Sequence, residues 1–298
     1  MYSKNKKIIW FVLLVLIVFG ALIWFVPIKN KPVSSKPVVA TTFFPLYDIT
    51  RNLVPKNIEV KIILPPGASP HTFEPTPTAI ANLNQAQVVY AIGYGLDDWV
   101  EAIKPATTPK IRVDQNIQLR KSVIIDEDNA SPIDPHYWLT IKNAKIISVN
   151  IEQDLESRFP EYQIELRSNL AQYLLSLDQA DMVIKSNLKN LTNRNLITLH
   201  DAWYYFAAEY GLTVAGTFEP AAGKEPTPQY LAALQTALSK NRTQILYSEP
   251  SVAITSLAAF VQDNKLRVII LDPAEGANGA NSYIDIMKTN AQLIAQNQ

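Results

Sequence analysis

Residues 58–92 read IEVKIILPPGASPHTFEPTPTAIANLNQAQVVYAI. Within this stretch, an apolar strand over 58–64 leads into a proline-rich loop that carries His71. Thr76 and Pro77 then supply a hydroxyl cap and a proline at the first helical position, which is typical of a helix start. A second apolar run, QVVYAI, closes the stretch. Strand, helix and strand in this order predict a parallel sheet covered by helices.

The same alternation continues from residue 37 to the end of the chain. Strands are predicted at 37–42, 58–64, 87–92, 110–113, 196–199, 212–217, 244–248 and 267–271. Helices are predicted to follow most of these strands, and one of them, over 161–191, contains no Gly or Pro and would be about 45 Å long. The sequence thus predicts two α/β lobes, each with a parallel sheet flanked by helices, joined by a long rigid helix. The predicted divisions are 1–36, 37–160, 161–192 and 193–298.

Composition excludes several classes of function. The chain has 298 residues and a formal net charge of zero, which argues against nucleic acid because phosphates require a basic surface. It has no cysteine, so disulfides, thiolate metal sites, a cysteine nucleophile and a lipid-modified N-terminal cysteine are all excluded.

The N-terminus has the pattern of a membrane segment. Lys4, Lys6 and Lys7 precede an uncharged run over 8–28, whose length of about 21 residues, or roughly 32 Å, is enough to cross a bilayer. The run ends without a small-x-small cleavage site, so we expect an uncleaved anchor, followed by a spacer over 29–36, with the folded part outside the cytoplasm. A cleaved signal, giving a secreted or periplasmic chain, is the alternative.

The chain has three histidines, and each lies in a loop or at the end of a predicted strand. Ligands of open parallel sheets bind at the carboxyl ends of the strands. His71 and His136 come from the first lobe, while His200, Asp272 and Glu249 come from the second. A cleft between the lobes would bring these side chains together, and three imidazoles with one carboxylate can fill the tetrahedral shell of zinc.

Taken singly, each of these residues also has an ordinary structural explanation. His71 could be a loop residue that forms hydrogen bonds. His136 could pack against the neighbouring aromatic rings, and His200 could cap the start of a helix. Asp272 and Glu249 each precede a proline, as many turn residues do. Spacing alone therefore leaves metal binding and a purely structural role both open.

Several motifs, in order, resemble the zinc and manganese ABC-transporter solute-binding proteins. The segment PPGASPHTFEPTP over 65–77 resembles the first ligand segment of that family, DPHYWL over 134–139 the second, and HDAWYYF over 200–206 the third. Further matches are TFFPLY over 42–47, EPTP over 225–228 and LDP over 271–273. The resemblance implies a metal held between two lobes by His71, His136, His200 and Asp272. Glu249 matches a family glutamate that lies near the site without binding the metal.

The resemblance also implies the cargo and the partners. Three imidazoles and one carboxylate suit zinc, and His200 stands where manganese-type members carry a glutamate, so zinc is predicted and manganese is the alternative. The expected function is extracytoplasmic binding of the ion by a monomer and delivery to an ABC permease driven by its ATPase. A surface adhesin is a further alternative. An enzyme is not expected, because a catalytic zinc keeps one coordination position open for water.

Overall fold

The computed structural model describes residues 36–103, 108–122, 131–217, 227–252, 257–279 and 282–298. The chain divides into two units, Met1–Lys36 and Pro37–Gln298, and the second contains all the helices and strands named below. The membrane segment predicted over 8–28 lies outside the described residues. Within the described ranges, no helix combines the length and the apolar character needed to span a bilayer.

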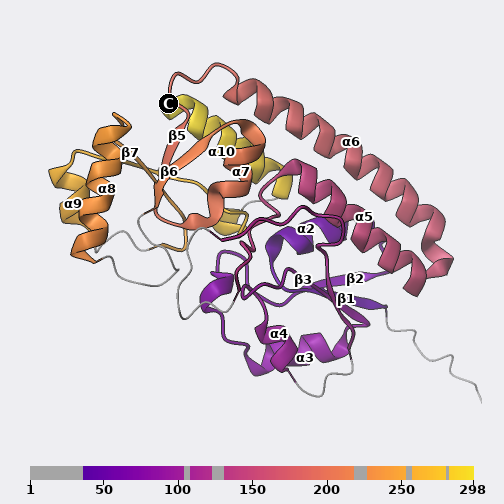
Figure 1. The fold of residues 1–298 in the computed structure, drawn as a ribbon. Helices are drawn as coiled ribbons and strands as arrows, with labels where there is room; N and C mark the ends of the chain where they lie inside the picture. The colour runs from indigo at the N-terminus through magenta and orange to yellow at the C-terminus, as the bar shows by residue number, and fades with distance from the viewer. Residues whose placement is uncertain (1–35, 104–107, 123–130, 218–226, 253–256, 280–281) are drawn as a thin grey trace, which may run out of the picture. The chain divides into compact units, whose positions relative to one another are not determined.

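The first lobe contains a four-stranded, fully parallel sheet with the order β2-β1-β3-β4. Its strands are β1 (Val38–Thr41), β2 (Glu59–Ile62), β3 (Val88–Ala91) and β4 (Lys110–Arg112). All four residues of β3 are buried, as expected of a central parallel strand covered on both faces. Val88 and Tyr90 face the core beneath α2 (Phe44–Leu53) and α5 (Ile141–Arg158), whereas Val89 and Ala91 face α3 (Pro77–Gln85) and α4 (Trp99–Ala102) (Figure 1).

The second lobe repeats this arrangement in the order β6-β5-β7-β8, again with all strands parallel. Its strands are β5 (Asn195–Thr198), β6 (Thr213–Thr217), β7 (Ile245–Ser248) and β8 (Arg267–Ile270). Ile197 and Leu246 pack towards α8 (Pro228–Lys240) and α9 (Ala258–Asp263), and Leu196 and Tyr247 belong to the core shared with α7 (Tyr204–Tyr210) and α10 (Tyr283–Asn297). The strand order reverses at the equivalent point of both sheets, between β1 and β3 in the first and between β5 and β7 in the second.

Local signals in the sequence set the ends of several helices. The hydroxyl of Thr76 accepts the N–H of Ala79 over 3.2 Å, and the Thr227 hydroxyl accepts the N–H of Tyr230 over 3.3 Å. Gly211 ends α7 in the left-handed region at φ 68°, which glycine adopts without steric cost. These caps confirm the helix starts and the stop that the sequence predicts.

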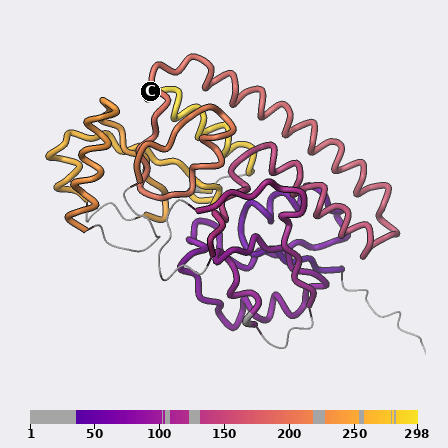
Figure 2. Tube along the Cα trace, viewed as in Figure 1, coloured from indigo at the N-terminus to yellow at the C-terminus, as the bar shows by residue number. Residues whose placement is uncertain are grey.

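The long helix α6 (Gln163–Leu188) has 26 residues, which corresponds to about 39 Å. It is shorter than the predicted 161–191, because Pro160–Tyr162 forms a separate 3₁₀ turn before it. The helix packs against α5 and α2 of the first lobe and against α10 of the second, and its course along both can be followed in Figure 2. Its inner face is buried, whereas Ile164 and Met182 from the same apolar pattern are 87% and 63% exposed.

Candidate metal centre

The topology of the second sheet places His200 beside Glu249. His200 lies two residues after β5, Glu249 directly follows β7, and these strands are neighbours. The Nδ1 atom of His200 lies 2.9 Å from Oε2 of Glu249, and Oε1 of Glu249 accepts the indole N–H of Trp203 over 3.1 Å. Because both carboxylate oxygens are engaged, the imidazole is held in one orientation, with its Nε2 on the side of the ring away from Glu249.

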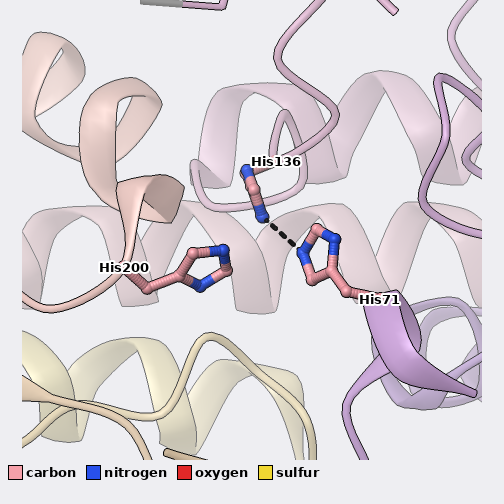
Figure 3. A group of neighbouring side chains, drawn as sticks. All are labelled: His71, His136 and His200. Atoms are coloured by element: carbon pink, nitrogen blue, oxygen red, sulfur yellow. Dashed lines mark hydrogen bonds between the residues drawn. The ribbon is translucent and has the colours of Figure 1, made fainter. Parts of the chain in front are cut away.

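His136 is held in a similar way by a carboxylate of its own segment. Oδ1 of Asp134 accepts the backbone N–H of His136 over 3.0 Å and lies 2.8 Å from Nδ1 of its ring. This turn, with Pro135 between the two residues, brings the Asp side chain back onto the His. Like His200, His136 is buried, and its Nε2 points towards His71 (Figure 3).

His71 completes the group from the 3₁₀ turn Pro70–Thr72, in the loop after β2. Its Nε2 lies 3.2 Å from Nε2 of His136. The ring centroids of His71, His136 and His200 are separated by 5.3, 5.1 and 4.9 Å, so the three rings form a nearly regular triangle. Figure 3 shows them converging from three separate segments of the chain.

The triangle has the size that a tetrahedral metal ion requires. One nitrogen of each ring lies within 4.8 Å of one nitrogen of each of the others. Bonds of 2.0–2.1 Å to zinc separate neighbouring ligand nitrogens by about 3.3 Å, close to the spacing of His71 and His136. Although the His71 residue reaches solvent, burial of its imidazole and the neighbouring rings of His200 and His136 lower its pKa well below the usual value. The neutral form, which coordinates metals, is therefore favoured.

Asp272, the predicted fourth ligand, is held by contacts within its own lobe. It follows β8 by two residues, and its Oδ1 accepts the N–H of Glu275 over 2.7 Å, while Asn290 of α10 bonds its backbone at both the N–H and the carbonyl. Among the described residues, the set of donors within 4.8 Å of one another contains the three histidines and no carboxylate. The role of Asp272 as the fourth ligand remains a prediction.

Sequence reasoning assigns no role to two other carboxylates of the site. Asp134 supports His136, and Oδ1 of Asp201 lies 3.4 Å from Nε2 of His200, on the side of the ring that faces the group. The motif Asp-Pro-His contains the signal for the first, since an aspartate two positions before a histidine can turn back onto it. No local pattern distinguishes Asp201 from a helix-start aspartate.

The loop that carries Asp272 also touches the first lobe. The indole N–H of Trp138 donates to the carbonyl of Pro273 over 2.8 Å, and the N–H of Gly67 donates to the carbonyl of Glu275 over 2.8 Å. Gly276, at φ 75°, lies against the ring of Phe44, where a Cβ atom would come within 2.6 Å of the ring carbons. The first-lobe segments that carry His71 and His136 are thus both joined to the Asp272 loop.

Comparison with known sequences gives a consistent family match. A family model described as zinc-uptake complex component A, periplasmic, matches residues 39–297. The zinc-binding protein AdcA of Streptococcus pyogenes is 23% identical over 292 residues, which cover 89% of this chain but only 57% of AdcA. The chain therefore spans little more than half the length of that relative. The manganese ABC transporter substrate-binding lipoprotein PsaA of Streptococcus pneumoniae is 28% identical, covering 95% of this chain and 96% of PsaA.

Solved structures show the same architecture. The crystal structure of ZnuA superimposes with a TM-score of 0.76 at 26% identity, covering 88% of this chain and 98% of that one. A match over 88% of this chain necessarily includes parts of both lobes. It confirms the predicted fold of two α/β lobes with parallel sheets flanked by helices.

Proposed function

The chain belongs to the zinc-uptake complex component A family, and from this membership we propose that it binds one divalent transition metal ion outside the cytoplasm for uptake into the cell. Zinc is the proposed cargo. The family membership supports the expectation that the chain is a binding protein and not an enzyme. In this proposal His71, His136 and His200 bind the ion, Asp272 supplies the fourth donor, and Glu249 orients His200.

One observation carries this proposal: three imidazole nitrogens from three segments converge within 4.8 Å, and two of the rings are backed by carboxylates. A histidine that binds a metal through Nε2 commonly donates its Nδ1 proton to a carboxylate, which fixes the tautomer and makes the ring more basic. The pairs Asp134–His136 and Glu249–His200 have this geometry. Three histidines that merely satisfied one another in a core would not need two such partners.

Zinc is proposed over manganese on the chemistry of the donors. Three nitrogen ligands suit zinc, whereas manganese favours oxygen-rich sites. Manganese is the second candidate, because PsaA, a relative of similar length, is named a manganese transporter component. The test is the metal content of the purified full-length chain and its affinity for each ion in competition with a chelator. The expected result is one zinc per chain, bound more tightly than manganese. The proposal is contradicted if the chain binds neither zinc nor manganese.

Delivery of the ion requires a partner in the membrane. We propose that the loaded chain, as a monomer, docks on the permease of an ABC transporter whose ATPase drives uptake, as the names of several relatives indicate for those proteins. We expect the loaded chain to copurify with such a permease. We also expect cells that lack the chain to grow poorly when zinc is scarce.

Residues 8–28 are proposed to keep the binder at the membrane. The sequence has no cysteine to carry a lipid, and this uncharged run precedes a lysine-containing spacer over 29–36. The proposed divisions remain 1–36, 37–160, 161–192 and 193–298. Membrane fractionation tests the anchor: the full-length chain is expected in the membrane pellet, and a chain shortened to 37–298 in the supernatant. Release of a form cut near residue 30 would indicate a cleaved signal instead.

A further inference from the structure

A short two-stranded segment of the first lobe reaches the second lobe beside the metal centre. The backbone N–H of Asp134 donates to the carbonyl of Arg120 over 3.1 Å, and the backbone N–H of Ser122 donates to the carbonyl of Pro132 over 2.9 Å. Between these two bonds, Lys121 and Ile133 form an antiparallel bridge. We call residues 120–122 and 132–134 the clasp. Its two sides are held together by backbone pairing, so Arg120 and Asp134 are fixed next to each other.

The clasp contacts the start of α7, shortly after His200. The guanidinium carbon of Arg120 lies 4.5 Å from the ring centroid of Tyr204 and 5.8 Å from that of Tyr205. The backbone N–H of Arg120 donates to the hydroxyl of Tyr205 over 2.9 Å, and this hydroxyl donates to the carbonyl of Asp134 over 3.2 Å. Tyr205 is thus bonded to both sides of the clasp, and Tyr204 lies against its Arg120 side.

The same clasp holds a ligand of the proposed centre. Nε of Arg120 lies 3.8 Å from Oδ2 of Asp134, and the other oxygen of Asp134 bonds His136 at the ring and at the backbone. One carboxylate therefore connects the His136 ring with an arginine that is stacked on the opposite lobe. The pair is mostly shielded from water, since the Asp134 side chain is 6% exposed and that of Arg120 30% exposed.

We propose that Arg120 is a positioning residue that fastens the second lobe to Asp134 and His136, and that this contact slows escape of the bound ion. The inference rests on the proposed function. The contact with Tyr204 joins the two lobes in the arrangement that this structure shows, and it is lost if the lobes move apart to release the ion. An interaction present only in that arrangement acts on the dissociation rate of the ion and leaves the association rate nearly unchanged.

The type of contact sets the size of the effect. A cation over an aromatic ring contributes from below one to about two kcal/mol as water is excluded, which corresponds to a change of up to about 30-fold in a rate. A partly shielded arginine belongs in the middle of this range. We therefore expect zinc to leave Arg120→Met about 5- to 10-fold faster than it leaves the unchanged protein.

The experiment measures zinc dissociation from the full-length chain by stopped flow with an excess of chelator, together with the association rate. Arg120→Met and Tyr204→Leu should each speed dissociation, the double variant should add little to either, and Arg120→Lys should restore part of the loss because it keeps the cation. Arg112→Met is the matched control, since Arg112 lies 5.2 Å from the Tyr94 ring within one lobe and should leave both rates unchanged.

A spectroscopic readout separates positioning from general loss of structure. Nitrogen NMR of the His136 ring should show a mixture of tautomers in zinc-free Arg120→Met and a single tautomer in the unchanged protein and in Arg112→Met. If zinc leaves both Arg120→Met and Tyr204→Leu as slowly as it leaves the unchanged protein, the inference is overturned, although the proposed zinc binding is not. If the unchanged protein binds no zinc, the proposed function fails instead.

Discussion

The indole nitrogen of Trp138 donates a hydrogen bond to the carbonyl oxygen of Pro273 over 2.8 Å. Trp138 lies two residues after His136, and Pro273 directly follows Asp272, so this bond joins a ligand segment of one lobe to the loop of the other. Tyr283 of α10 strengthens the same junction by donating its hydroxyl proton to the carbonyl of Trp138 over 2.6 Å. The relative position of the two lobes is therefore set partly by buried polar contacts next to the site.

Trp138→Phe should destabilise the protein because it leaves the buried Pro273 carbonyl without its donor. The expected loss in the free energy of unfolding is about 1–3 kcal/mol, measured by urea denaturation. Trp99→Phe is the control, since the indole nitrogen of Trp99 is buried without a hydrogen-bond partner among the described residues and its removal should cost less. Equal losses in the two variants would show that ring packing, and not the bond to Pro273, determines the effect.

Glu249→Gln should weaken zinc binding without removing a proposed ligand. The amide accepts a proton less strongly than the carboxylate and can present an N–H to Nδ1 of His200, so the ring loses its fixed tautomer. Losing such a partner typically lowers metal affinity about 10- to 100-fold. Competition with a chromophoric chelator measures the change. Asp154→Asn, which alters a carboxylate bonded to Tyr90 and Arg158 away from the site, should bind zinc like the unchanged protein.

Asp272 and Asp201 are the two candidates for the fourth ligand of the proposed ion. Asp272 is the predicted donor, and Asp201 lies 3.4 Å from Nε2 of His200. Asp272→Asn should lower zinc affinity by about 100-fold or more, at the upper end of the losses known for supporting residues, and Asp201→Asn by less than about tenfold. The reverse order, measured in the same chelator assay, would transfer the ligand role to Asp201.

Glu275 should make stability depend on pH. Burial, followed by the nearby Glu249 and Asp272, raises its pKa from 4.5 to about 8, and its Oε2 is buried with no hydrogen-bond partner in the part of the chain that the structure describes. Because the folded state favours the protonated carboxyl, this contribution to stability is fully present below about pH 4.5 and is lost as the pH rises through about 8. The Glu275→Gln amide does not titrate, so this variant should gain stability relative to the unchanged protein between about pH 5 and pH 9.

Urea unfolding at a series of pH values measures this difference. Glu59→Gln, which changes an exposed carboxylate of β2, is the control. Its free energy of unfolding should depend on pH in the same way as that of the unchanged protein. If the stability of Glu275→Gln also depends on pH in the same way as that of the unchanged protein, the Glu275 carboxyl is ionised in the folded state at neutral pH.

Most elements can be predicted from the sequence because their signals are local. Buried parallel strands such as β3 are short apolar runs, and the pairs Thr76-Pro77 and Thr227-Pro228 mark helix starts through their own side chains. The predicted long helix, over 161–191, starts too early and ends too late when compared with α6. Its apolar pattern also includes Ile164, which faces solvent, because periodicity identifies a helix but not which neighbour covers each face.

The site is predictable from the sequence only in outline. Strand ends place His200 and Glu249 at the same edge of a sheet, and their bond of 2.9 Å is a consequence of that topology. The contacts of Arg120 with Tyr204 and of Trp138 with Pro273 cannot be predicted, since each joins opposite lobes and residues far apart in sequence. Contacts of this kind depend on how two folded halves meet, which no local pattern encodes.

Of the three imidazoles, those of His136 and His200 are enclosed, whereas the His71 residue borders the solvent. Its ring also differs from the other two, because its nearest polar contact within the described part of the chain is another imidazole, that of His136, and not a carboxylate. We expect an arriving ion to exchange its hydration water at His71 first, because this ring is the least constrained of the three, whereas Asp134 and Glu249 hold the other two rings in place.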